Sequence, residues 1–143
     1  MLKPPEPAPG ALGEAPEGTS PFKGKTGVIR VWNAFFNSLA GLKDAWRHES
    51  AFRQEVVLGA ILIPVACVVP VDAAERALLI AAVLLVLIVE LLNTSVEAAI
   101  DRISFDHHSL SRRAKDLGSA AVFVALALCV VVWALILAPL ALR

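Results

Sequence analysis

The chain has 143 residues, of which 57% are hydrophobic and only 18% are charged, and its mean hydropathy is +0.70. Soluble domains carry about 25% charged residues, so this composition disfavours a water-soluble fold. The 13 Lys and Arg residues balance the 13 Asp and Glu residues, and Tyr is absent, which argues against the basic, aromatic-rich surface of a nucleic-acid-binding protein.

The N-terminal segment differs from the rest of the chain. Its first 26 residues contain six of the nine prolines and four of the eight glycines. It lacks the apolar block of a secretory signal peptide. We therefore expect residues 1–27 to form a flexible tail preceding a membrane domain over residues 28–143.

Residues 28–48 show the spacing of an amphipathic helix. Its apolar face comprises Val28, Val31, Trp32, Phe35, Phe36, Leu39, Leu42 and Trp46, and its polar face Arg30, Asn33, Asn37, Lys43 and Arg47. A helix with tryptophans and basic residues on opposite faces is typical of the membrane interface. The same pattern also fits a simple anchor without a catalytic role.

Three charge-free runs predict three transmembrane helices. Residues 56–71 and 77–89 are uncharged, as is the longer run 117–142. A bilayer core of about 30 Å requires roughly 20 helical residues. We place the spans at about residues 52–71, 77–100 and 117–141, with a polar loop over residues 101–116.

Lys and Arg residues indicate the orientation of these spans. Seven precede the first span and four lie in the loop between the second and third, against one in the first connection and one at the C-terminus. The positive-inside rule therefore places the N-terminus and the second loop in the cytoplasm.

The middle span carries a polar stripe. At 100° per residue, Asn93, Thr94, Glu97 and Asp101 all fall within about 60° of Glu90, along about 16 Å of helix. Carboxylates inside a bilayer cost several kcal/mol unless they are paired, protonated or in contact with water. A polar subunit interface would explain one such residue, whereas a cluster of acids suits a hard divalent cation.

Further polar residues lie near the predicted ends of the spans. Glu49 and Arg53, at i and i+4, have the spacing of an interfacial ion pair. Arg112 and Arg113 suit either phosphate oxygens or topology determination. Acids for a metal, basic groups for phosphate and an amphipathic helix for lipid together favour phosphoryl transfer to a lipid alcohol, whereas a cation or proton channel would use the acids alone.

Three segments carry a family resemblance: ESAFRQE (49–55), VELLNTSVEAAIDR (89–102) and AKDLGSAA (114–121). They resemble the prokaryotic diacylglycerol kinase family in sequence and order, and the likeness runs from about Arg30 to the C-terminus. The resemblance implies an all-α integral membrane protein, a homotrimer with an N-terminal surface helix and three transmembrane helices per subunit. It also implies active sites shared between subunits in the bacterial cytoplasmic (inner) membrane, where ATP and Mg²⁺ serve to phosphorylate diacylglycerol to phosphatidic acid in phospholipid metabolism.

The resemblance also implies roles for individual residues. Glu90 matches the general base, and Asn93 a neighbouring polar residue that supports catalysis. Glu49 and Glu97 match magnesium ligands. The implied nucleotide contacts are Arg30, Asn37, Glu49, Glu97, Asp106, His107, His108, Lys115 and Asp116. The implied lipid contacts are Arg30, Phe35, Trp46, Ala51, Arg53, Glu55, Glu90 and Ser119.

Some positions depart from the family pattern. Phe36 and Asn37 stand where relatives commonly have Gly and an aromatic residue, and Asp106 and His107 replace a Glu-Tyr-like pair. Read without the resemblance, His107 and His108 are solvated loop residues. Undecaprenol phosphorylation, a variant within the same family, remains an alternative activity, although Gln54 and Glu55 favour the diacylglycerol branch by resemblance.

Overall fold

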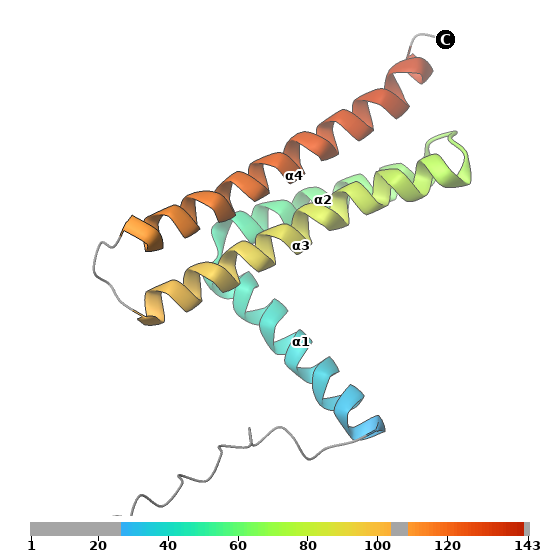
Figure 1. The fold of residues 1–143 in the computed structure, drawn as a ribbon. Helices are drawn as coiled ribbons and strands as arrows, with labels where there is room; N and C mark the ends of the chain where they lie inside the picture. The colour runs from blue at the N-terminus through green and yellow to red at the C-terminus, as the bar shows by residue number, and fades with distance from the viewer. Residues whose placement is uncertain (1–26, 104–108, 142–143) are drawn as a thin grey trace, which may run out of the picture. The chain divides into compact units, whose positions relative to one another are not determined.

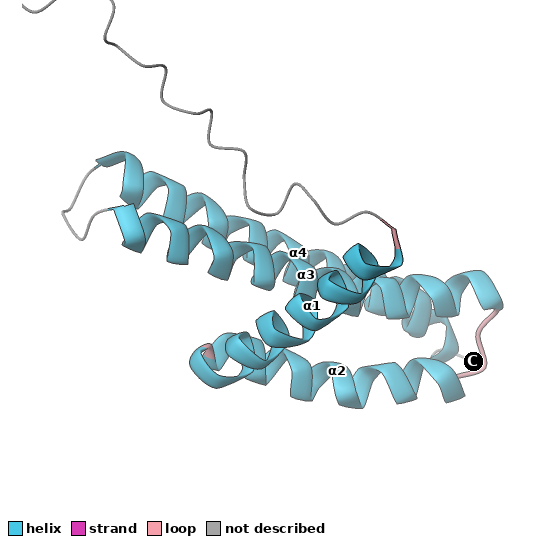
Figure 2. Cartoon of the chain, turned by 90° about the horizontal axis from the view of Figure 1, so that it is seen from below, coloured by secondary structure: helices cyan, strands magenta, loops and turns pink. Residues whose placement is uncertain are grey.

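The structure, a computed structural model, describes residues 27–103 and 109–141. They form four helices, α1 (Val28–His48), α2 (Ser50–Val68), α3 (Ala73–Ile103) and α4 (Ser109–Ala141) (Figure 1). Helices and short loops account for all of the described chain in Figure 2, which confirms the expected all-α fold. Residues 1–26, most of the expected tail, lie outside the described residues.

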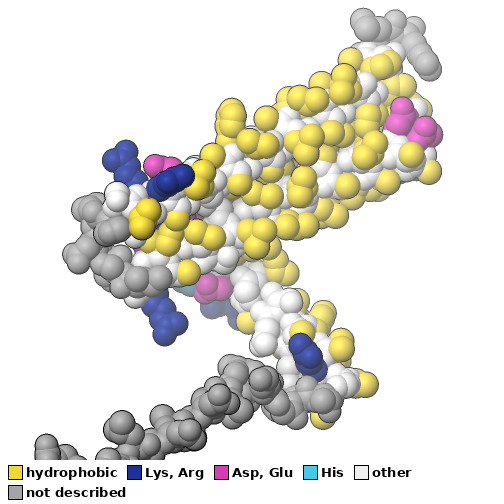
Figure 3. Space-filling view, in the orientation of Figure 1, with side chains coloured by type: hydrophobic (Ala, Val, Ile, Leu, Met, Phe, Trp, Pro, Cys, Tyr) yellow, Lys and Arg dark blue, Asp and Glu magenta, His cyan; other side chains and the backbone are white. Residues whose placement is uncertain are grey.

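Three of the helices are long and apolar enough to cross a membrane. The candidate spans are Ser50–Val68, Ala73–Arg102 and Ser109–Leu140, with mean hydropathies of 1.7, 2.5 and 3.0. Hydrophobic side chains cover the visible face of these helices, and charged side chains gather towards the ends (Figure 3). The chain is therefore a multi-pass membrane protein.

The expected polar loop over residues 101–116 is wrong in its extent. Helix α3 continues to Ile103, and α4 already begins at Ser109. The residues between Ser109 and Asp116 include Leu, Arg, Ala and Lys, which all favour helix. The ends of the hydrophobic runs therefore mark where the chain can leave the membrane. They do not mark the ends of the helices, which extend further.

Helix α3 lies between the other two spans and packs against both α2 and α4 (Figure 2). Its buried residues are Leu79, Ala82, Val83, Val86 and Glu90. They recur every three or four positions and so follow one face of the helix. On α2 the buried positions Phe52, Gly59 and Ala66 are seven residues apart and form the facing stripe.

Side-chain hydrogen bonds also fix the contact between α3 and α4. The indole nitrogen Nε1 of Trp133 donates to the backbone oxygen of Leu79 across 3.2 Å. Ala125, two turns earlier on α4, is buried. The α3–α4 contact therefore combines apolar packing with a directional bond within the apolar region.

The turn between α2 and α3 is closed by three charged residues. Asp72 and Glu75 form a capping box, because each side chain accepts a hydrogen bond from the backbone N–H of the other. The guanidinium of Arg76 donates to the backbone oxygens of Ala66, Val69 and Val71 at 3.2 to 3.4 Å. Arg76 thus ties a carbonyl in the last turn of α2 to two carbonyls of the turn that follows.

Helix α1 presents an apolar face that the other described residues leave exposed. Trp32, Phe35 and Phe36 form an aromatic cluster with ring centroids 5.1 to 6.5 Å apart, and all three are exposed. The expected amphipathic pattern is therefore present in the folded helix. An exposed aromatic face of this kind suits the membrane interface.

Arg53 does not pair with Glu49 as the i, i+4 spacing suggested. Its guanidinium donates instead to the backbone oxygens of Trp46 and Arg47, at 3.0 and 3.2 Å. These carbonyls belong to the last turn of α1, where helical partners are missing. The Arg53 guanidinium therefore binds the backbone where α1 meets α2, and it does not pair with the Glu49 carboxylate.

Candidate functional site

The polar stripe on α3 continues the buried face of the helix. Leu79, Val83 and Val86 are buried, and the same face then carries Glu90, Asn93 and Glu97. Glu90 is 5% exposed. The stripe therefore begins inside the packed helices and runs towards the end of α3 that leads to α4.

Three other carboxylates lie near Glu90. The negative charges of Glu49 and Glu97 act on Glu90, and the charge of Glu90 acts on Glu55. Glu49 and Glu55 come from the start of α2, and Glu97 lies two turns beyond Glu90 on α3. Residues from two helices thus form one acidic cluster, which we define as Glu49, Glu55, Glu90 and Glu97.

No cation within the described part of the chain compensates the acidic cluster. The ion pairs found there are His48–Asp44, Arg112–Asp116 and Lys115–Asp101. Repulsion among carboxylates in a poorly solvated region is unfavourable unless a cation or a proton offsets it. The acidic cluster is therefore arranged to receive positive charge from outside the described chain.

Glu49 occupies the N-cap position of α2. Its side chain makes no capping hydrogen bond, although a carboxylate at this position commonly accepts one from the first turn. The Glu49 carboxylate is therefore not committed to stabilising the helix start and remains available to a ligand.

Asn93 links the acidic cluster to α4. Its amide nitrogen Nδ2 donates to Oε1 of Glu97 at 3.3 Å. The amide oxygen Oδ1 is buried, has no hydrogen-bond partner in the described chain, and faces Gly118 of α4. The Asn93 amide is therefore held between a carboxylate on its own helix and the backbone of the next.

Lys115 and Asp116 of α4 each form an ion pair. The Lys115 ammonium binds the Asp101 carboxylate of α3. Asp116 lies 3.8 Å from Arg112 on its own helix, and both of these side chains are well exposed. The first pair joins the ends of α3 and α4 next to the stripe, while the second contributes little to stability because water screens it.

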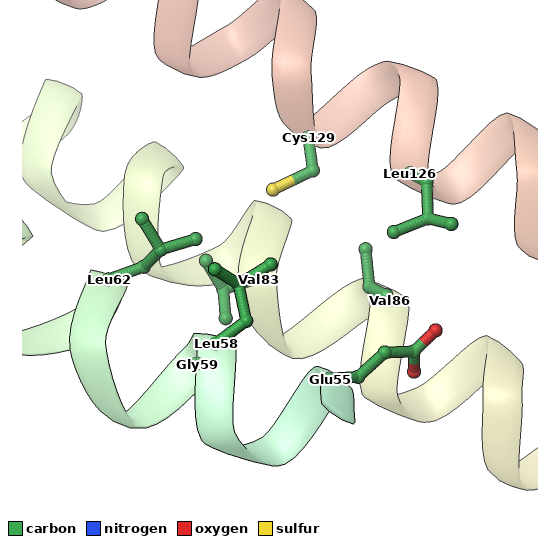
Figure 4. A pocket seen from close by; sticks show the side chains of 8 residues that line it. All are labelled: Glu55, Leu58, Gly59, Leu62, Val83, Val86, Leu126 and Cys129. Carbon is green, nitrogen blue, oxygen red and sulfur yellow. The ribbon is translucent and has the colours of Figure 1, made fainter. Parts of the chain in front are cut away.

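An apolar pocket lies beside the acidic cluster, between α2, α3 and α4. Leu58 and Gly59 of α2, Val83 of α3 and Cys129 of α4 contribute to its wall, and the Glu55 carboxylate is its one charged group (Figure 4). Oε2 of Glu55 is buried and has no hydrogen-bond partner among the described residues. The pocket surface is therefore almost entirely hydrocarbon, although a buried carboxylate lies beside it.

The remaining expected site residues are distributed along the helices. Arg30, Phe35, Asn37 and Trp46 are exposed residues of α1, and Ala51 and Ser119 are exposed on α2 and α4. Asp106, His107 and His108 lie outside the described residues.

Two contacts near the site were not predicted from the sequence. Asp101 was recognised as part of the stripe, but its partner Lys115 lies on another helix, so only the packing of α3 against α4 reveals the pair. Gly118 lies at the start of the predicted third span. Its contact with Asn93 has a weak signal in the sequence, because residues 118, 122, 125 and 129 share the helical spacing of a packed face.

The described residues do not contain a self-sufficient metal site. No group of three or more His, Cys, Asp or Glu side chains lies close enough together, within residues 27–103 and 109–141, to hold an ion. Magnesium is commonly bound by one or two protein carboxylates together with water and substrate phosphates. The carboxylates present are therefore suited to a metal that arrives with a phosphate ligand.

Comparison with known proteins connects this geometry to a family. The model of the family described as prokaryotic diacylglycerol kinase matches residues 36–137. A diacylglycerol kinase of Pseudomonas aeruginosa is 58% identical over 82% of this chain and 96% of its own length. The Escherichia coli K12 enzyme is 48% identical over 78% and 92%, and a Helicobacter pylori enzyme is 41% identical over 75% and 84%. The chain belongs to the prokaryotic diacylglycerol kinase family.

Proposed function

We propose that this chain is a lipid kinase that transfers the γ-phosphate of ATP to the 3-hydroxyl of diacylglycerol and forms phosphatidic acid. The observation that carries the proposal is the buried Glu90 carboxylate within an acidic cluster that has no cation from the described chain. A base shielded from water and next to a site for positive charge is what phosphoryl transfer to an alcohol requires.

Glu90 acts as the general base. Its carboxylate takes the proton from the diacylglycerol 3-hydroxyl while the hydroxyl oxygen forms a bond to the γ-phosphorus. The bond from that phosphorus to the bridging oxygen breaks, and ADP leaves. Burial of Glu90 between packed helices limits competition by water and so favours transfer to lipid over hydrolysis.

Glu49 and Glu97 are the proposed ligands of the magnesium that accompanies ATP. Glu49 has no capping bond to give up, and Glu97 is held by Asn93. When bound, magnesium neutralises charge on the phosphate oxygens. Lys115, positioned by Asp101 near the end of the stripe, and Asp116 complete the proposed nucleotide contacts.

The lipid is proposed to approach along the membrane plane. The pocket beside Glu55 offers apolar walls for an acyl chain. The exposed aromatic face of α1, with Phe35 and Trp46, suits the headgroup region. The substrate therefore requires no deep aqueous entrance.

The proposed assembly is a homotrimer in the bacterial inner membrane. The N-terminus and the α3–α4 connection face the cytoplasm, where ATP is available, because Lys and Arg are concentrated in these two regions. Many outward-facing apolar side chains on α2, α3 and α4 remain for lipid or for neighbouring copies of the chain. Arg76, in the turn between α2 and α3, is hydrogen-bonded to the backbone oxygens of Ala66, Val69 and Val71.

The alternatives of undecaprenol phosphorylation and cation or proton conduction are not favoured. The relatives compared above carry the name diacylglycerol kinase. The proposal is tested by incubating the purified protein in mixed micelles with magnesium, labelled ATP and either diacylglycerol or undecaprenol.

We expect labelled phosphatidic acid, with transfer to undecaprenol at least about tenfold slower. Equal or faster transfer to undecaprenol would reassign the acceptor, and no transfer to either lipid would remove the kinase assignment. Glu75→Gln provides a matched control for substitutions in the acidic cluster, because Glu75 lies on the same helix but belongs to the capping box of the opposite turn.

A further inference from the structure

The backbone of α4 lies close to the polar stripe at Gly118. A methyl group on this residue would overlap the amide oxygen Oδ1 of Asn93 and stand 3.3 Å from its amide carbon Cγ. The overlap is with the end of the Asn93 side chain, so an added methyl group would force the amide to turn away from its present position. The Asn93 side chain therefore occupies the space that any residue larger than glycine would need.

The hydrogen bond to Glu97 fixes which way the Asn93 amide points. Glu97 accepts hydrogen bonds and has none to donate while it is ionised, so the Asn93 NH₂ group must face it. The 3.3 Å bond from Nδ2 to Oε1 of Glu97 has this sense. The amide oxygen then lies on the opposite side, buried and unpartnered in the described chain, in the room left beside Gly118.

We propose that Gly118 is a positioning residue for the kinase reaction. By leaving room for the Asn93 amide, Gly118 keeps the NH₂ group on Glu97 and so sets the direction of the Glu97 carboxylate towards the magnesium of bound nucleotide. This inference rests on the proposed function, because it assigns Glu97 to the metal. Hydrogen-bonding partners of metal ligands commonly change metal affinity by about 10- to 100-fold.

The role differs from that of an ordinary packing glycine. Gly59, on α2, faces only the apolar Cγ1 atom of Val83, which would stand 3.2 Å from an added methyl group. Gly41, on α1, has open space around it. Among the described glycines, Gly118 is the one whose neighbour is a polar side chain of the proposed site.

The test is the magnesium requirement of Gly118→Ala, measured as the magnesium concentration for half-maximal rate at fixed ATP. We expect a rise of at least about tenfold, with KM for diacylglycerol within about twofold of wild type, because the lipid pocket is not touched. Gly41→Ala is the matched control, since it makes the same change in open space and should leave the requirement unchanged. A simple loss of packing would lower the yield of folded protein without shifting the magnesium requirement.

A double-substitution cycle with Asn93→Ala separates positioning from other effects. Asn93→Ala alone should raise the magnesium requirement, and adding Gly118→Ala should then change it by less than about twofold, because the overlapping amide is gone. An undiminished effect of Gly118→Ala in the Asn93→Ala background would overturn the proposal, as would an unchanged magnesium requirement in the single variant.

Folding of the variants is monitored by circular dichroism and chromatography. If Gly118→Ala alone does not fold, the proposal predicts that adding Asn93→Ala restores folded protein, and continued misfolding of the double variant would contradict it. Failure of the proposed function has a separate signature, since wild-type protein would then produce no phosphatidic acid at any magnesium concentration.

Discussion

The four glutamates of the acidic cluster differ in their surroundings, and these differences assign them different tasks. Glu90 is enclosed between helices, Glu97 accepts a hydrogen bond from Asn93, and Glu49 stands at a helix start without capping it. Glu55 adjoins the apolar pocket. A shielded carboxylate suits proton transfer, whereas accessible and oriented carboxylates suit a metal.

Replacing Glu49 by Gln tests the metal assignment at the level of one residue. We expect the magnesium concentration for half-maximal rate to rise at least about tenfold, because an anionic ligand becomes neutral. The free energy of unfolding should change by less than about 0.5 kcal/mol, because the carboxylate makes no capping bond. Activity assays across a magnesium titration, paired with thermal unfolding, measure both quantities.

Glu75→Gln serves as the reference in the same titration, because Glu75 lies at the far end of α3. A magnesium requirement of Glu49→Gln equal to that of this reference would remove Glu49 from the metal site.

At the level of helices, the 3.6-residue spacing of side chains predicted which residues share a face of α3. The 3.6-residue period placed Glu90, Asn93 and Glu97 on one face of α3, and the structure continues that face from the buried residues Leu79 and Val83. This part was predictable because all of these residues belong to one helix, whose geometry is fixed.

Relations between helices could not be predicted in the same way. The Lys115–Asp101 pair and the approach of Gly118 to Asn93 depend on how α4 is placed against α3. The start of α4 at Ser109 was also missed, because charged residues end a hydrophobic run without ending a helix. The backbone carbonyls that bind Arg53 likewise carry no sequence signal.

Arg76→Gln tests the turn that joins α2 and α3. The substitution removes three charge-assisted hydrogen bonds to the carbonyls of Ala66, Val69 and Val71. We expect a loss of about 2 to 4 kcal/mol in the free energy of unfolding, because partly buried carbonyls lose a charged donor. Reversible denaturation in mixed micelles measures this change.

The same variant should keep the catalytic rate per folded molecule. Arg76 lies 14 residues before Glu90, about 21 Å along the helix. Arg76→Lys is the informative companion, because an ammonium cannot span the carbonyls as a guanidinium does, and it should recover only part of the stability. Wild-type stability in Arg76→Gln would show that the three bonds contribute nothing net.

At the level of the whole molecule, most apolar surface of the three spans faces outward. Phe123, Val130 and Leu135 of α4 are 72%, 68% and 71% exposed. Lipid can cover such surfaces, and so can neighbouring helices, because association within a membrane depends on packing detail more than on hydrophobicity. The exposed apolar surface of one chain is therefore compatible with the proposed homotrimer.

Native mass spectrometry of the protein released from detergent tests the assembly. We expect a species containing three copies of the 15.2 kDa chain, and activity that declines together with this species when detergent is increased. Full activity in a preparation that contains only single chains would contradict the homotrimer.

The central claim is that Glu90 is the base for transfer of phosphate to diacylglycerol, and Glu90→Gln tests it most directly. The substitution keeps the size of the side chain and removes its capacity to accept a proton, so we predict a fall of at least about 100-fold in labelled phosphatidic acid formation. Binding of ATP with magnesium should persist, and Glu75→Gln should retain the wild-type rate. Wild-type phosphatidic acid formation by Glu90→Gln would contradict the account.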